Sequence, residues 1–242
     1  MRIGLIADIH GNLVALDSVL AELDRARVDR ILCLGDLAVL GPQPGEVIDR
    51  IRERDISTVC GNTDAWLVSR HPIPVEKPES EVSVELTEWT ASRLDRQQLD
   101  FVRNLPLTLT VGVEHARSLL CFHATPSSLD DITHAAQPVG VGEQWTADIV
   151  CCGHTHIQAV WRVDQQLWIN PGSVGLPGVG PGGPGLPQNR NVTWVEYAVL
   201  DIDNRQTALK MHRHELDVET MWQAVRESDM PLQAWWRMRW SK

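Results

Sequence analysis

Seven side chains of this sequence are of the types that bind divalent metal ions, and they fall in five short segments. Two segments carry close pairs, an Asp-x-His and a His-x-His; in the His-x-His pair, alternate residues of an extended segment point the same way. Mixed imidazole, carboxylate and amide-oxygen ligands suit manganese, iron, zinc, nickel or cobalt. The seven residues are Asp8, His10, Asp36, Asn62, His123, His154 and His156.

Each segment also has an ordinary structural interpretation when it is taken alone. An Asp-x-His pair fits a solvated turn, Gly-Asp and Gly-Asn are turn signals, and a single His after a strand is commonly a hydrogen-bonded structural residue. All five segments, however, follow directly after a predicted strand. Ligands of open α/β sheets bind at the carboxyl ends of strands, so the conjunction predicts one shared metal centre.

The charges of this set favour a phosphate ester as the ligand. Asp8 and Asp36 contribute two negative charges, whereas the His and Asn side chains contribute none. Two divalent cations would leave a surplus of about two positive charges, which favours a bound hydroxide and a phosphate ester. Two metals about 3.5–4 Å apart can hold the attacking oxygen and the phosphoryl oxygens together.

Strand-like and helical segments alternate regularly near the start of the chain. This order is expected to place three of the ligand-bearing segments at one edge of a sheet. Short apolar runs predict buried strands, and leucines spaced by three and four predict a helix that Asn12 is placed to cap. The βαβαβ order implies parallel strands joined by right-handed crossovers. The predicted ranges are strands 3–7, 31–34 and 56–60, and helices 13–28 and 44–53.

The rest of the chain predicts a helical segment followed by mostly β structure. Residues 71–78 predict an extended connection, and residues 79–104 predict one or two helices that end before Pro106. This segment, at about 71–105, is predicted to form a helical cap within a single domain of residues 1–242. The order predicts an α/β fold of two packed sheets with helices outside. The predicted strands are 107–113, 118–122, 149–152, 158–163, 167–169, 193–201 and 207–212.

The composition bounds the environment and the partners of the protein. Apolar residues make up 43% of the 242, yet no run approaches the roughly 18 apolar residues of a membrane span. The chain opens on a strand-like segment without the zones of a signal peptide, which predicts a cytoplasmic protein. A formal net charge of -10 makes long nucleic acid a poor partner and leaves a small phosphate-bearing molecule as the expected one. The five cysteines are predicted to be buried free thiols.

The order and spacing of these motifs resemble those of the calcineurin-like metallophosphoesterases. The segments Ala7–Leu13, Asn170–Gly175 and Tyr197–Asp201 look like the small bacterial phosphodiesterase branch of that superfamily. The resemblance implies a two-sheet β-sandwich flanked by helices, with a dinuclear metal site at one edge. It also implies hydrolysis of a small-molecule phosphodiester or phosphomonoester by a metal-bridging hydroxide, with manganese as the expected metal.

The resemblance further assigns roles to individual residues. It implies that Asp36 bridges two metals and that Asp36, Asn62 and His123 are the catalytic residues. Asn12 would contact the phosphate, and Ser173 would support the site. The remaining assignments are Asp8, His10 and His156 on the first metal, and Asn62, His123 and His154 on the second.

The sequence departs from the family pattern where many relatives carry a His after the Gly-Asn. Thr63 occupies this position, next to the substrate, and a threonine hydroxyl is too weak an acid to protonate a leaving group. The substitution favours leaving groups that need little protonation, or a metal-bound water as the donor. Asp64 either orients a ligand or caps the following helix. The nearly uncharged loop within residues 172–188 either alters the pocket or has no role.

Other interpretations stay open at this stage. A binding or scaffold protein that keeps the fold without turnover is the alternative to an enzyme. The C-terminal tryptophans Trp235, Trp236 and Trp240 either pack a terminal helix onto the body or onto a second copy of the chain, or contact a membrane surface. Trp89 and Arg93, one turn apart, either face a substrate or lie in core and solvent, respectively.

Overall fold

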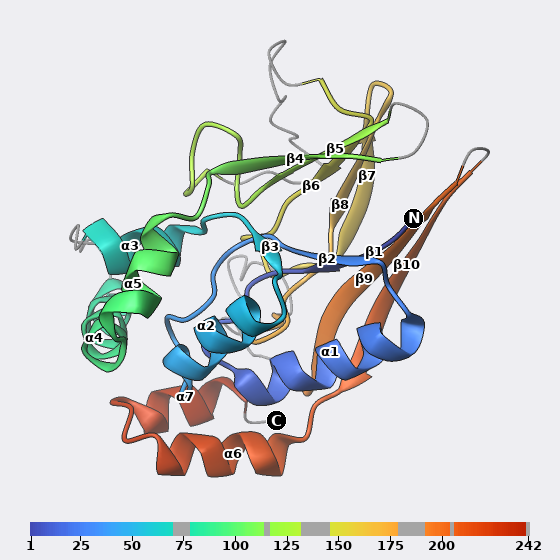
Figure 1. Cartoon of the computed structure of the whole chain (residues 1–242). Helices are drawn as coiled ribbons and strands as arrows, with labels where there is room; N and C mark the ends of the chain where they lie inside the picture. Colours follow the sequence, from blue (N-terminus) through green and yellow to red (C-terminus); the bar gives the residue numbers. More distant parts are fainter. Residues whose placement is uncertain (70–77, 114–116, 132–145, 179–191, 204–205, 241–242) are drawn as a thin grey trace.

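Two five-stranded mixed sheets pack face to face in this computed structural model, which describes residues 1–69, 78–113, 117–131, 146–178, 192–203 and 206–240. Sheet 1 has the order β10-β9-β1-β2-β3, and sheet 2 has the order β4-β5-β6-β8-β7. The predicted fold class, an α/β sandwich of two sheets flanked by helices, is confirmed (Figure 1). Sheet 1 comprises β1 Arg2–Ile6, β2 Arg30–Cys33, β3 Ser57–Thr58, β9 Trp194–Ile202 and β10 Thr207–Glu215. Sheet 2 comprises β4 Thr108–Gly112, β5 Ser118–Phe122, β6 Ile149–Cys151, β7 Ala159–Val163 and β8 Gln166–Asn170.

The predicted βαβαβ unit forms the middle of sheet 1. Strands β1, β2 and β3 are parallel neighbours, joined by α1 (Leu13–Ala26) and α2 (Pro44–Glu53). Asn12 caps α1, because its Oδ1 atom accepts the backbone N–H of Ala15 at 3.1 Å. The third strand is shorter than the predicted 56–60, since only Ser57 and Thr58 pair with β2. The parallel order brings the ends of β1, β2 and β3 to one edge of the sheet.

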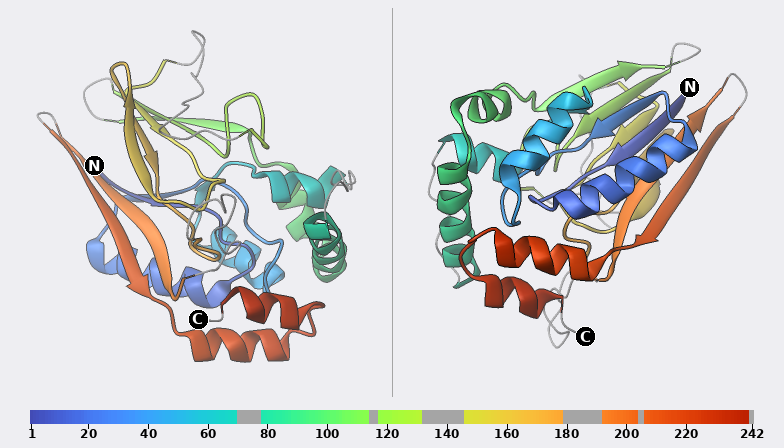
Figure 2. Two further views of the ribbon diagram at one scale, coloured as in Figure 1. Left: turned by 180° about the vertical axis from the view of Figure 1, so that it is seen from behind. Right: turned by 60° about the horizontal axis from the view of Figure 1, so that its bottom comes forward.

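Three helices lie between β3 and β4 in the sequence. Helix α3 (Asn62–Ser69) starts almost directly after β3 and was not given a range by the sequence pattern. The predicted helical stretch forms two pieces, α4 (Pro78–Arg93) and α5 (Arg96–Arg103), the second of which begins at a capping box of Asp95 and Gln98. The three helices lie together at one end of the molecule, beside α2 (Figure 2). That they cap the site stays a prediction.

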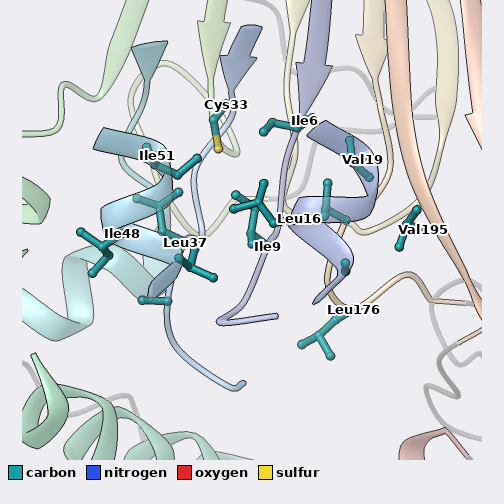
Figure 3. Packing of buried hydrophobic residues seen from close by; sticks show 14 of the residues in the cluster. Ile6, Ile9, Leu16, Val19, Cys33, Leu37, Ile48, Ile51, Leu176 and Val195 are labelled. Carbon is teal, nitrogen blue, oxygen red and sulfur yellow. The ribbon is translucent and has the colours of Figure 1, made fainter. Parts of the chain in front are cut away.

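The apolar core has three parts that follow from the alternation of the strands. Ile3 and Leu5 of β1 point into the space between the sheets, where they meet Leu119 and Cys121 of β5. The opposite face of sheet 1 packs on α1 and α2. Figure 3 shows residues of this cluster, with Leu16 and Val19 from α1 and Ile48 and Ile51 from α2. A smaller cluster around Phe122 and Trp168 lies on the other face of sheet 2. All five cysteines are buried and free, as predicted.

The chain ends in two helices, α6 (Val218–Glu227) and α7 (Gln233–Arg239), which lie on the helical side of sheet 1 (Figure 1). Trp236 has no exposed surface and Trp240 is buried, and both belong to the core cluster shared with α1 and α2. These two tryptophans therefore pack onto the body of the chain, which was one of the predicted alternatives. Assembly of a homo-oligomer through this segment stays a prediction. Among the described helices, none combines the length and apolar character needed to cross a membrane.

Some predicted features lie outside the described residues. These are most of the extended connection 71–78, the turn at 114–116 and most of the loop 172–188.

Candidate metal centre

The seven predicted ligands meet at the edge where strands of both sheets end. Four come from the ends of β1, β2 and β3 in sheet 1, and three come from the ends of β5 and β6 in sheet 2. Five of the seven are buried, and His154 and His156 keep some exposed surface. The sheet 1 residues are Asp8, His10, Asp36 and Asn62; the sheet 2 residues are His123, His154 and His156.

The first group of side chains gathers around Asp8. One ligand atom each from Asp8, His10, Asp36 and His156 lies within 4.8 Å of the other three. The Nε2 atom of His10 lies 3.5 Å from Asp36 Oδ2, and the Nε2 atom of His156 lies 3.5 Å from Asp8 Oδ1. This spacing suits four ligand atoms around a single cation.

The second group gathers around Asn62. Its Oδ1 atom lies 2.9 Å from His123 Nε2 and 3.2 Å from His154 Nδ1, and these two ring nitrogens are 3.2 Å apart. Asp36 joins this group as well, because its Oδ2 atom lies 3.5 Å from His123 Nε2. The same Asp36 oxygen is therefore equidistant from one imidazole nitrogen of each group.

Backbone carbonyls fix the orientation of three of the four imidazole rings. In each ring Nδ1 faces a carbonyl oxygen, which only accepts, so Nδ1 carries a proton and Nε2 is the nitrogen that faces the centre and can bind a metal when the ring is neutral. The pairs are His10 with Val39 (3.0 Å), His123 with Leu34 (2.7 Å) and His156 with Leu176 (2.8 Å). The Nε2 atoms of His10 and His156 face each other at 3.0 Å. Two nitrogens that face each other at this distance can share one proton or one cation between them, so these residues fit a bound cation.

The pKa values of the cluster are far from their ordinary ranges. Burial favours the neutral form of His123, but the carboxylates of Asp36 and Asp8 outweigh it and raise the pKa of His123 to about 10. Burial likewise opposes ionisation of Asp36, yet His123 and His10 hold the pKa of Asp36 well below its usual value. Burial raises the pKa of Asp8, and burial with the nearby His10 lowers the pKa of His156 to about 3. The cluster thus retains a proton as the counter-charge to its carboxylates, a position that a metal ion can take.

Five of the seven residues have left-handed backbone conformations, which L-residues rarely adopt. Main-chain hydrogen bonds hold these turns: the N–H of Asp8 donates to Gly35 at 3.0 Å, and the N–H of His10 donates to the Asp36 carbonyl at 3.0 Å. Such conformations cost about 1 kcal/mol or more each and concentrate at functional sites. The φ values are Asp8 54°, His10 49°, Asp36 59°, His154 69° and His156 57°.

Asp64 supports the turn that carries Asp36. Its fully buried carboxylate accepts the backbone N–H groups of Leu37 at 2.9 Å and of Gly61 at 2.9 Å. Burial, together with the charge of Asp36, raises the pKa of Asp64 to about 6. Gly61 has to be a glycine, because a Cβ there would collide with Asp36 Oδ1. The contact with Leu37 fits the orientation of a ligand, and the contact with the N–H of Gly61, directly before α3, fits helix capping, so the structure is consistent with both predicted roles of Asp64.

Asn170, the last residue of β8, and Ser173, in the loop that follows, connect the ligand-bearing loops of the two sheets. The buried Ser173 hydroxyl donates to the Asp8 carbonyl at 2.7 Å and accepts the N–H of Leu176 at 2.9 Å. The Asn170 amide donates to the Gly153 carbonyl at 2.7 Å. These contacts reach the predicted ligands closely: Asp8 is itself a predicted ligand, Gly153 precedes His154, and the Leu176 carbonyl faces the ring of His156. The contacts of Ser173 match its predicted supporting position.

The two predicted substrate contacts lie in different surroundings. Asn12 has no exposed surface, and its side chain is engaged by Ala15, by the Gly175 carbonyl at 3.1 Å and by the sulfur of Met221. These contacts give Asn12 a structural role, and the predicted phosphate contact of Asn12 stays a prediction. Thr63 donates its backbone N–H to Asp36 Oδ1 at 2.9 Å, and its buried hydroxyl has no hydrogen-bond partner among the described residues.

Trp89 contacts the apolar core, and Arg93 contacts the C-terminal part of the chain. Arg93 pairs with Asp229, which lies between α6 and α7, and its guanidinium sits 5.7 Å from the Trp89 ring centre. Trp89 packs against the main core. The pair joins α4 to the C-terminal helices, which agrees with its structural interpretation.

Sequence comparison places the chain in a family. The model of the calcineurin-like phosphoesterase superfamily domain matches residues 1–205, so this protein belongs to that superfamily, as its motifs predicted. An uncharacterised protein of Methanocaldococcus jannaschii is 24% identical over 235 residues, which cover 95% of this chain and 93% of that protein.

Two solved structures share the fold over nearly the whole chain. A metallophosphoesterase from Sphaerobacter thermophilus is 26% identical, with a TM-score of 0.72, and the match covers 96% of this chain and 95% of that one. A hypothetical protein from Pyrococcus horikoshii is 18% identical, with a TM-score of 0.76 and the same coverage. Since 96% of the chain is covered, this similarity extends beyond residue 205, where the match to the family domain ends.

Proposed function

We propose that this protein is a phosphoesterase that works with two divalent metal ions, for which manganese is the expected element. The observation that carries the proposal is the position of Asp36. One of its carboxylate oxygens lies 3.5 Å from His10 Nε2 in the first group and 3.5 Å from His123 Nε2 in the second. A carboxylate in this position can contact two cations, which is the arrangement that two-metal hydrolysis requires.

The donor sets divide between the two ions. Asp8, His10 and His156 would hold the first ion, and Asn62, His123 and His154 would hold the second. Two such ions, when bound, supply the positive charge that polarises a phosphoryl group and activates water. The protein residues keep the imidazoles in one tautomer, through the carbonyls described above, and hold the donor atoms before substrate arrives.

The substrate is a small phosphate ester, with a diester preferred over a monoester. The similarity to a metallophosphoesterase of Sphaerobacter thermophilus supports the class of reaction. The formal net charge of -10 disfavours a long polyanion. Thr63 cannot act as a strong acid, so the reaction should favour substrates whose leaving group needs little protonation.

A metal-depletion assay tests the proposal. Protein stripped of metal should be inactive toward bis(p-nitrophenyl) phosphate, and manganese should restore turnover. Asp36→Asn should reduce the rate to that of the uncatalysed reaction, because one neutral amide oxygen replaces the shared carboxylate. Asp164→Asn is a matched control, since it removes the same charge from an exposed turn between β7 and β8. A protein that binds manganese but turns over neither mono- nor diesters would instead support the scaffold alternative.

A further inference from the structure

The C-terminal helices reach the metal centre through a short loop that follows β2. The indole N–H of Trp236, in α7, donates to the Leu40 carbonyl at 2.6 Å. The preceding carbonyl, that of Val39, faces His10 Nδ1 at 3.0 Å. Adjacent peptide groups of one loop therefore connect a buried tryptophan to an imidazole of the first ligand group.

This loop has a conformation that needs external support. Leu40 has a φ of 85°, a region that an L-residue with a bulky side chain rarely adopts. The loop is also closely packed against the segment after β1, because a Cβ at Gly41 would collide with the His10 carbonyl. The Trp236 hydrogen bond is made at Leu40 itself, so it acts at the strained residue.

Trp236 is held rigidly enough to serve as that support. Its side chain has no exposed surface, and its ring packs against Trp222 at 5.8 Å and against Trp240 at 5.5 Å between ring centres. Met221 of α6, also fully buried, contacts the Asn12 amide two residues after His10. Both helices lie beyond residue 205, where the match to the family domain ends.

We propose that Trp236 is a positioning residue for the metal centre, which it acts on through Leu40, Val39 and His10. The inference rests on the proposed function, because it assumes that His10 holds a metal. The indole keeps the strained loop in place, and the loop keeps the His10 ring in the tautomer and orientation in which Nε2 faces the cluster. The C-terminal helices then contribute to the geometry of the metal centre.

Manganese titration of the full-length protein by calorimetry tests this inference. We expect two binding steps in the unmodified protein, one of which is lost in His10→Ala. Trp236→Phe should weaken that same step about tenfold, in the range found when groups behind a ligand are removed, and leave the other step unchanged. Trp240→Phe is the matched control, because the Trp240 indole N–H is buried in the same cluster without a hydrogen-bond partner among the described residues.

A second substitution separates positioning from general stability. Leu40→Gly removes the cost of the positive φ, so the Trp236→Phe, Leu40→Gly double variant should recover part of the lost affinity. Replacing Trp236 by 3-benzothienylalanine, which keeps the shape and lacks the N–H, should reproduce the Trp236→Phe effect in a protein that keeps its packing.

The outcomes are distinguishable. Equal weakening by Trp236→Phe and Trp240→Phe, or unaltered manganese binding by the benzothienyl variant, would overturn the role of Trp236. A protein that binds no manganese in its unmodified form would overturn the proposed function instead.

Discussion

The carboxylate of Asp64 holds the backbone of Asp36, since its Oδ2 atom lies 2.8 Å from the Asp36 amide nitrogen. The relationship is nearly reciprocal, because Asp36 Oδ1 accepts the backbone N–H of Thr63, the neighbour of Asp64. Two carboxylates thus fix each other's turns across the ends of β2 and β3. Asp36 keeps its second oxygen, Oδ2, free to face both imidazole groups.

Asp64→Asn should therefore weaken both the fold and the proposed metal site. The Asp64 carboxylate accepts three backbone N–H groups on its two oxygens, and an asparagine amide offers one oxygen and an NH₂ group that repels the remaining donors. Leaving buried donors unpaired costs about 1–3 kcal/mol, or roughly 2–12 °C in melting temperature for a chain of this size. Thermal unfolding and manganese titration measure the two effects. If Asp64→Asn behaved like the exposed Asp164→Asn, the supporting role of Asp64 would be wrong.

Metal binding should stabilise the protein as a whole. The facing imidazole nitrogens of the cluster present a site for a cation, and a ligand that binds only the folded state adds stability by mass action. Manganese at about 100 times its dissociation constant should add about 2.7 kcal/mol, or roughly 5–11 °C in melting temperature. Differential scanning calorimetry with manganese and with a chelator measures this shift. Asp36→Asn serves as the control, in which manganese should change the melting temperature little.

Metal binding should also release at least one proton at neutral pH. The pKa of His123 is raised to about 10 in the metal-free cluster, so this ring is protonated at pH 7.5, whereas a metal ligand must be neutral. His156, with a pKa of about 3, is already neutral and releases none. Below pH 10 protons compete with the metal, so affinity should rise about tenfold per pH unit for each proton released. Calorimetry in buffers of different ionisation enthalpy counts the protons, and a binding enthalpy independent of buffer would contradict the prediction.

The rate of the proposed reaction should depend steeply on the leaving group. The hydroxyl of Thr63 is buried without a partner among the described residues and is too weak an acid to donate a proton. Across a series of aryl methyl phosphodiesters, the rate should fall as the pKa of the departing phenol rises. Steady-state kinetics with manganese-loaded protein measures the slope. A rate that does not vary with the phenol would point to a proton donor elsewhere in the site.

Much of this centre follows from the sequence, because its residues stand at strand ends. Asp8, Asp36 and His123 each follow an apolar run, and the parallel order of β1, β2 and β3 brings strand ends to one edge. A residue that directly follows one of these strands is therefore predicted to lie close to the residues that follow the neighbouring strands. The family match confirms the class of protein, and the predicted assignment of each ligand to a metal stays a proposal.

The supporting contacts could not be predicted, because they depend on the precise path of the loops. The bond from Trp236 to Leu40 spans 196 residues and depends on a left-handed backbone at a leucine, which no local pattern indicates. The sequence does not decide between the two roles of Asp64, because its partners are backbone N–H groups, which every residue type except proline offers. The side chain of Asn12 caps α1 and also bonds to the Gly175 carbonyl, a contact across 163 residues that the sequence does not indicate.

The seven donors come from both sheets, four from one and three from the other. Each proposed ion takes donors from both sheets: Asp8 of sheet 1 and His156 of sheet 2 for the first ion, and Asn62 of sheet 1 and His123 of sheet 2 for the second. Sliding or separating the two sheets would therefore separate the donors of each ion. Each bound cation would link the two sheets. Mechanical unfolding of the metal-loaded chain should then proceed in one concerted rupture, and removal of the metals should let one sheet peel away before the other.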